Sequence, residues 1–97
     1  MSIKNIRLGG RTLGSGKPAL IVAEMSGNHN HDLKRALKIV DAAADAGADA
    51  IKFQTYTPDT LTIDSDRPEF MVTWKGKRQK LYDLYGEAYT PWEWHKE

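Results

Sequence analysis

The sequence contains no cysteine, which excludes disulfide bonds and thiolate metal sites. It also lacks a long apolar run, since "PALIVA" is far too short to cross a bilayer. The opening segment, "MSIKNIRLGG", lacks the apolar stretch of a secretory signal. Neither sign of charge is in excess, because 14 Lys and Arg stand against 13 Asp and Glu. We therefore predict a cytoplasmic protein that binds neither nucleic acid nor a membrane.

Several motifs that carry chemistry are missing as well. No Gly-rich phosphate loop, Ser-nucleophile motif or zinc-binding helix motif is present. The segment "DSDRPE" lacks the Gly and the closing Glu of a calcium loop, which favours a solvated loop. His29 and His31 are two positions apart, a spacing that would place them on different faces of a helix. We expect no metal site from these 97 residues alone.

The first half of the chain has a clear pattern of secondary structure. Residues 3–13, "IKNIRLGGRTL", predict a β-hairpin in which Gly9 and Gly10 supply the positive φ of a tight turn. Residues 19–55 predict a β-α-β unit with strands over 19–24 and 49–55 and a helix over 33–46. Asn30 or Asp32 can cap the start of that helix, and Gly47 can end it.

The second half is less regular. Residues 56–79 read as a long polar loop, and "KLYDLYGEA" reads as a short helix. "TPWE" predicts another helix start, with Thr90 as N-cap, Pro91 at the first helical position and Glu93 closing a capping box. One β-α-β unit leaves strand edges and a helix face without partners. We therefore expect these residues to be the front of a longer chain; the alternative is a small α+β domain with a frayed tail.

Polar side chains gather toward the carboxyl ends of the two predicted parallel strands. Side chains alternate along a strand, so Glu24 ends one face of the first strand, and Lys52 and Gln54 share a face of the second. Parallel α/β folds bind ligands at such ends. We expect the three groups to point into one polar hollow, where Lys52 would pair with Glu24 or with an anionic ligand. The alternative is a Glu–Lys pair without a chemical role.

The loop "SGNHN" follows the first strand and allows two interpretations. It can be a simple connection in which Gly27 turns the chain, or it can offer the amide of Asn28 and the imidazole of His29 to a polar ligand. The nearby helix start would favour an anion, although the Asp32 carboxylate weakens that effect. Aromatic residues further along could stack on a sugar, but packing of short helices is their commoner use.

Longer stretches resemble a known enzyme family. "IVAEMSGNHNHDLKRALKIVDAAADAGADAIKFQTYTPDTLT" resembles the start of the sialic acid synthases. "EMSGNHN", "KFQTYTPDT" and "LYDLYGEAYTPWEWH" are most similar to the pseudaminic acid branch of that family, rather than to the neuraminic or legionaminic acid branches. The similarity covers most of residues 17–95, and the motifs occur in order and at the spacing of the family.

The resemblance implies a (β/α)8 TIM barrel of about 250 residues, preceded by a hairpin that closes its bottom and followed by a small antifreeze-like domain. It implies condensation of phosphoenolpyruvate with an N-acetylated amino sugar to give a nine-carbon 2-keto acid and phosphate. It also implies a divalent cofactor, Mn²⁺ or Mg²⁺, whose histidine ligands lie on later strands, and a homodimer. On this interpretation, residues 1–97 alone are expected to be inactive.

The family motifs also imply roles for individual residues. Glu24 matches an acidic residue that accepts a proton, and Lys52 is the second catalytic candidate. Gln54, Asn28 and His29 match substrate-binding positions. Three other functions remain open: an N-acetylneuraminic or legionaminic acid synthase, a Schiff-base aldolase that uses Lys52, and a non-catalytic binding fragment.

Overall fold

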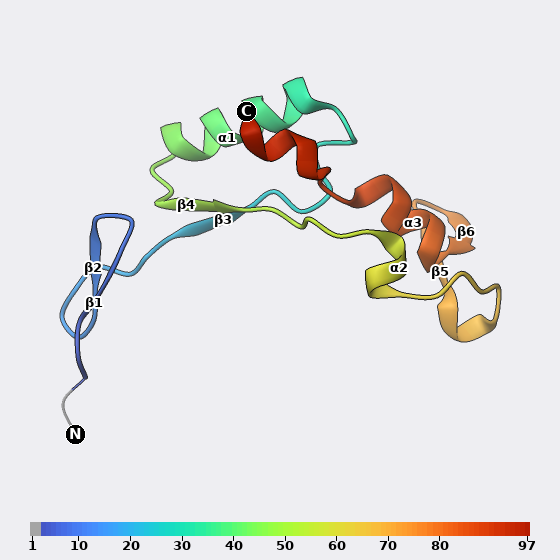
Figure 1. The fold of residues 1–97 in the computed structure, drawn as a ribbon, viewed down its shortest axis with the longest axis horizontal. Helices are drawn as coiled ribbons and strands as arrows, with labels where there is room; N and C mark the ends of the chain where they lie inside the picture. The colour runs from blue at the N-terminus through green and yellow to red at the C-terminus, as the bar shows by residue number, and fades with distance from the viewer. Residues whose placement is uncertain (1–2) are drawn as a thin grey trace.

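The computed structural model describes residues 3–97, a mixed α/β chain (Figure 1). Its strands are β1 (Ile6–Leu8), β2 (Arg11–Leu13), β3 (Val22–Glu24), β4 (Ala50–Lys52), β5 (Met71–Trp74) and β6 (Lys77–Lys80). Its helices are α1 (Leu33–Asp45), α2 (Pro58–Leu61) and α3 (Leu81–Ala88), with 3₁₀ turns η1 (Pro68–Phe70) and η2 (Trp92–Lys96). None of the helices within residues 3–97 is both long and apolar enough to cross a membrane.

The predicted N-terminal hairpin is confirmed. β1 and β2 pair antiparallel, and Gly9 and Gly10 both have positive φ, 54° and 79°, which matches the twist of a tight two-residue turn. An ion pair joins this hairpin to the next unit, because Arg11 Nη2 lies 2.6 Å from Asp49 Oδ1. The other oxygen of Asp49 accepts a hydrogen bond from the backbone of Ile21 at 2.9 Å.

The predicted β-α-β unit is also confirmed, with shorter strands. β3 and β4 pair in parallel and are each three residues long. Asp32 caps α1 by accepting from the backbone N–H groups of Lys34 and Arg35, and Gly47 follows the helix at φ 90°. Within residues 3–97, β3 and β4 pair only with each other.

The prediction of an irregular loop over residues 56–79 is wrong. This stretch contains α2, η1 and the β5–β6 hairpin, whose turn has Lys75 and Gly76 at φ 50° and 76°. The hairpin was missed because "KRQK" has little intrinsic β preference, and cross-strand pairing forms it instead. The short helix predicted next to it is confirmed as α3.

The helix start predicted at "TPWE" is wrong in detail. Pro91 is the N-cap of the 3₁₀ turn η2, and no side chain caps this turn. Thr90 does not cap it because its side chain is buried, 4% exposed, against His29. A tertiary contact has therefore replaced the local capping interaction.

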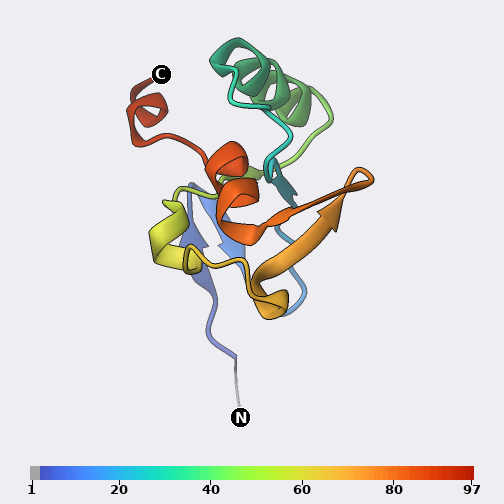
Figure 2. The same ribbon diagram turned by 90° about the vertical axis from the view of Figure 1, so that its right-hand side faces the viewer.

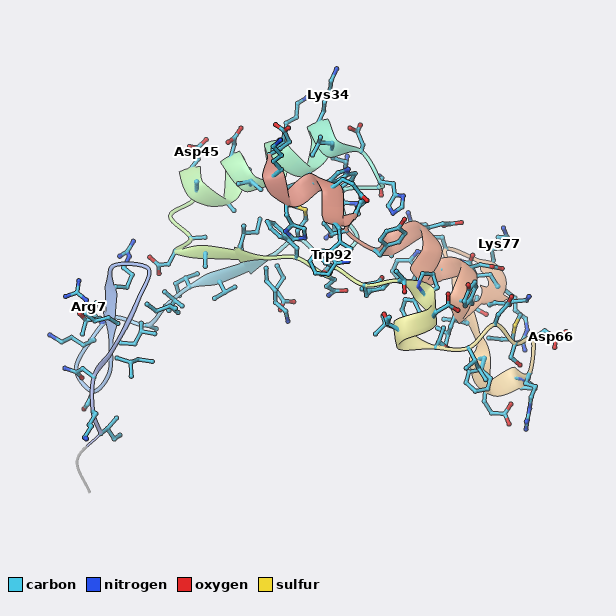
Figure 3. The ribbon with its side chains drawn as sticks, viewed as in Figure 1. Arg7, Lys34, Asp45, Asp66, Lys77 and Trp92 are labelled. Atoms are coloured by element: carbon cyan, nitrogen blue, oxygen red, sulfur yellow. The ribbon has the colours of Figure 1, made fainter. Side chains whose placement is uncertain are left out.

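The described residues form an arch rather than a ball (Figure 1). The Cα radius of gyration is 17.6 Å, whereas a compact domain of this length has about 13 Å. Among the described residues, the buried apolar ones are Met25 and Ala36. By contrast, Val22 in β3 is 45% exposed, and Phe53, directly after β4, is 36% exposed. Figure 2 shows the β5–β6 hairpin projecting from α3, and Trp92, which is labelled in Figure 3, is 71% exposed. Residues 3–97 thus leave much apolar surface uncovered.

Candidate functional site

Glu24 and Lys52 lie side by side at the carboxyl ends of β3 and β4. They are direct partners in the parallel register, and Lys52 Nζ lies 3.1 Å from Glu24 Oε1. Their side chains are 56% and 59% exposed. A pair exposed to this degree contributes little to stability, typically about 0.2–1 kcal/mol. Both charges are therefore available to a ligand at little cost to the fold.

The prediction that Glu24, Lys52 and Gln54 point into one hollow is wrong for residues 3–97. Gln54 lines a separate hollow of about 360 Å³ together with Asn28, and neither Glu24 nor Lys52 lines it. The physical reason is that two strands cannot enclose a lumen, so the ends of β3 and β4 remain open to solvent. The structure thus brings the predicted residues together in two pairs, Glu24 with Lys52 and Asn28 with Gln54.

The Asn28 side chain is held by its own loop. The side-chain Nδ2 of Asn28 donates to the Met25 carbonyl at 2.9 Å, and the backbone carbonyl of Asn28 accepts from Arg35 Nε of α1 at 2.6 Å. Ser26 and Asn30 on either side have positive φ, 51° and 52°. Non-glycine residues are uncommon in that conformation, and such backbone strain concentrates at functional sites.

Gly27 allows α3 to approach this loop. A Cβ at Gly27 would lie 3.1 Å from the Cβ of Ala88 and 3.3 Å from its carbonyl oxygen. A larger residue would push α3 outward, and α3 forms one wall of the hollow.

His29 is fully buried, and both its ring nitrogens are engaged within the fold. Nδ1 accepts from the backbone N–H of His31 at 3.0 Å, so the proton of the neutral ring is on Nε2. Nε2 lies 3.2 Å from Thr90 Oγ1 and donates to it, and the Trp94 ring packs edge-on with centroids 5.0 Å apart. Contact between His29 and a substrate would require one of these bonds to break, so its substrate-binding role stays a prediction.

Thr90 and its neighbour Tyr89 form hydrogen bonds to the segments that follow β3 and β4. The Thr90 backbone N–H donates to the Gln54 carbonyl at 2.8 Å, while its hydroxyl contacts His29. His31 Nε2 donates to the Tyr89 carbonyl at 2.9 Å. Sequence reasoning missed this role because the Thr-Pro pair reads as a local helix start.

Burial first, and then the nearby His31, lower the pKa of His29 from its ordinary value of 6.5. The unfolded chain keeps that ordinary value, so it binds more protons than the folded chain between the two pKa values. The contribution of His29 to stability is therefore complete above pH 6.5 and is lost as the pH falls toward the lower folded value.

We expect ¹⁵N NMR of the His29 ring to show the Nε2–H tautomer and a titration midpoint below 6.5. An Nδ1–H tautomer would contradict the hydrogen-bond assignment, and a midpoint at or above 6.5 would contradict the effect of burial on the His29 pKa.

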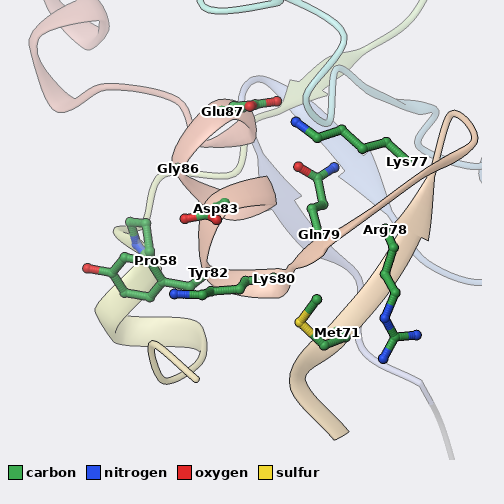
Figure 4. A pocket seen from close by; sticks show the side chains of 10 residues that line it. All are labelled: Pro58, Met71, Lys77, Arg78, Gln79, Lys80, Tyr82, Asp83, Gly86 and Glu87. Carbon is green, nitrogen blue, oxygen red and sulfur yellow. The ribbon is translucent and has the colours of Figure 1, made fainter. Parts of the chain in front are cut away.

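A second hollow lies between β6 and α3, and its walls carry opposite charges (Figure 4). Lys77, Arg78 and Lys80 contribute from the strand, and Asp83 and Glu87 from the helix. Lys80 is already paired with Asp64, whose hydrogen bond and charge raise the lysine pKa. None of the predicted site residues lines this hollow.

Metal ligands are not gathered within the described residues. No group of three or more His, Asp or Glu side chains in residues 3–97 is placed to hold one ion. The residues present therefore do not form a complete Mn²⁺ or Mg²⁺ site by themselves.

Comparison with known proteins decides the family. The family model described as "NeuB family" matches residues 39–97, which is more than half of the chain. The chain belongs to the NeuB family. This confirms the resemblance found in the sequence motifs.

Within the NeuB family, the chain is similar to named synthases. It is 52% identical over 84 residues to the pseudaminic acid synthase of Campylobacter jejuni and 44% identical over 84 residues to that of Helicobacter pylori, covering 84% of this chain and 24% of each relative. It is 52% identical over 48 residues to the N,N'-diacetyllegionaminic acid synthase of Legionella pneumophila, covering 50% of this chain and 14% of that protein. The chain thus spans about a quarter of the length of the pseudaminic acid synthases it matches.

Proposed function

We propose that this chain forms the first part of a (β/α)8 barrel enzyme of the pseudaminic acid synthase type. The reaction is the condensation of phosphoenolpyruvate with a 2,4-diacetamido-2,4,6-trideoxy hexose to a nine-carbon 2-keto sugar acid and phosphate. The observation that carries the proposal is the Glu24–Lys52 pair, in register at the ends of parallel strands in a chain 52% identical to a pseudaminic acid synthase. Barrel enzymes keep their chemistry at that end.

The proposed chemistry uses both members of this pair. C3 of phosphoenolpyruvate attacks the sugar aldehyde carbon, a C–C bond forms, and the aldehyde oxygen takes a proton from solvent. Water then adds to the cationic C2 and gives one proton to Glu24, which leaves a hydroxyl on C2. As the C2–O bond to phosphate breaks, this hydroxyl gives its proton to the departing phosphate and becomes the C2 ketone, and Glu24 returns its proton to solvent. The negative charge of Glu24 also stabilises the cation at C2. Lys52 offsets the charge of the phosphoenolpyruvate as a point cation.

The surroundings of Lys52 favour this role over that of a Schiff-base nucleophile. A nucleophilic lysine is activated by desolvation in an apolar pocket or by a neighbouring cation. Lys52 instead is 59% exposed and pairs with a carboxylate. A purely binding role accounts less well for the chain, because the named relatives above are synthases.

Other components belong to the complete enzyme. The proposal includes a divalent cofactor, Mn²⁺ or Mg²⁺, held outside residues 3–97, and a cytoplasmic homodimer. A metal ion held there would polarise the sugar aldehyde as a Lewis acid. The match to a legionaminic acid synthase keeps that related sugar as the second candidate substrate.

A chimera tests the function directly. In the synthase chimera, this chain replaces the segment of the C. jejuni pseudaminic acid synthase that it matches. We expect phosphate release that requires both phosphoenolpyruvate and the diacetamido trideoxy hexose. This chain alone, the control, is expected to release none, because a barrel needs strands from the rest of the enzyme.

The sugar dependence of the chimera separates the candidates. Phosphate release with the legionaminic precursor in place of the diacetamido trideoxy hexose would move the assignment to the second candidate. A chimera with normal far-UV circular dichroism and no phosphate release with either sugar would refute the proposed function.

A further inference from the structure

The 360 Å³ hollow that contains Asn28 and Gln54 is completed by a segment that the family resemblance did not single out. We propose that Trp74 and Lys75, at the tip of the β5–β6 hairpin, form one wall of the amino-sugar site and help to select the sugar. This inference rests on the proposed function for the identity of the sugar. The hollow itself is defined by the loop after β3, the residues after β4, the hairpin tip and α3.

The lining of the hollow has the chemistry of a site for a neutral amido sugar. The carboxamides of Asn28 and Gln54 can exchange hydrogen bonds with hydroxyl and acetamido groups. Trp74, Tyr56 and Tyr85 also line the hollow, and aromatic rings can pack against C–H groups and acetamido methyl groups.

The charged residues that line the hollow favour a neutral sugar over the anionic phosphoenolpyruvate. Lys75 and Glu87 line it with opposite signs, so the hollow carries no net excess of positive charge for an anion. Lys52, the cation proposed for phosphoenolpyruvate, does not line it. The two substrates would therefore occupy neighbouring places, with the sugar between the loop and the hairpin.

The hairpin holds Trp74 at the rim in a defined position. Trp74 pairs with Lys77 as the last rung of a four-pair ladder, and the turn between them has Lys75 and Gly76 at positive φ. The Trp74 side chain is 53% exposed, so it has an open surface for a ligand. By contrast, Trp94 already packs against His29.

Trp74→Ala in the synthase chimera tests the inference. We expect the KM for the diacetamido trideoxy hexose to rise about three- to ten-fold, which is the scale of an aromatic contact. The KM for phosphoenolpyruvate is expected to stay within about two-fold. Trp74→Phe, which keeps a ring, should recover part of the loss. The matched control is Trp92→Ala, since Trp92 is 71% exposed and does not line the hollow.

Equilibrium dialysis of radiolabelled diacetamido trideoxy hexose against the chimera measures sugar binding without turnover. It therefore tests the role of Trp74 separately from the proposed reaction. Binding weakened by Trp74→Ala in a chimera that releases no phosphate would support this inference and refute the proposed reaction. Phosphate release whose sugar KM is the same with and without Trp74 would overturn this inference and leave the reaction standing. No detectable sugar binding, or binding indifferent to Trp74 in an inactive chimera, would overturn both.

Discussion

Glu24→Gln in the synthase chimera is expected to lower kcat by about 100-fold or more, the scale of a lost acid–base group. The glutamine keeps the shape of the side chain but cannot accept the proton of the attacking water, and it removes the charge that stabilises the cation at C2. The measurement is phosphate release at saturating concentrations of both substrates. Because Glu24 is 56% exposed, the fold should tolerate the change, with an unfolding free energy within about 1 kcal/mol of the parent chimera.

A matched control lies elsewhere in the chain. Glu69 also forms an exposed ion pair, with its Oε1 3.1 Å from Arg67 Nη2 and its side chain 58% exposed. It lies on the η1 turn rather than at a parallel strand end, so Glu69→Gln should leave kcat unchanged. Near-normal turnover in Glu24→Gln, or an equal loss in both variants, would remove Glu24 from the proton-transfer step.

Thr90→Val is expected to destabilise the chimera by about 1–3 kcal/mol, although it changes the side-chain volume little. The hydroxyl of Thr90 accepts the Nε2–H of His29, and both side chains are buried, at 4% and 0% exposure. A methyl group in place of the hydroxyl leaves that N–H buried without an acceptor, which costs its desolvation. Urea unfolding of the chimera measures the loss.

Thr90→Ser is the conservative partner of that variant, because it keeps the hydroxyl and removes one methyl group. We expect it to recover most of the lost stability. The two variants should also differ in how firmly the loop after β3 is held, since it is the Thr90 hydroxyl that contacts His29 in the loop that carries Asn28. Equal stabilities of Thr90→Val and Thr90→Ser would show that the His29–Thr90 hydrogen bond contributes nothing.

The fold was predictable where local chemistry decides it. Gly9 and Gly10 specify a tight hairpin turn, and Asp32 and Gly47 mark the two ends of α1. The β5–β6 hairpin was missed for the opposite reason, because its charged strand β6 has no apolar alternation to indicate a strand. The Lys75–Gly76 turn was the one local signal that could have revealed it.

One part of the candidate site was predictable from the sequence, and another part was not. Alternation along a strand, combined with the parallel register, was enough to predict that Glu24 and Lys52 meet. It was not enough to predict that Gln54 faces a different hollow, or that Trp74 comes to its rim from twenty residues further along the chain. These placements depend on how the hairpin and α3 pack, which no short-range pattern encodes.

The sequence by itself determined the hairpin, the β-α-β unit, the family motifs and the adjacency of one acid and one amine, because each follows from neighbours within a few residues or from a simple period. Only the tertiary structure decided which residues become partners across long separations. His29 and Thr90 are 61 positions apart and form a buried hydrogen bond. Thr90, predicted as a helix cap, therefore links its segment to the loop after β3 instead. The physical reason is that a buried polar group must find a partner wherever the fold provides one, and this need outweighs the weaker preferences of local sequence.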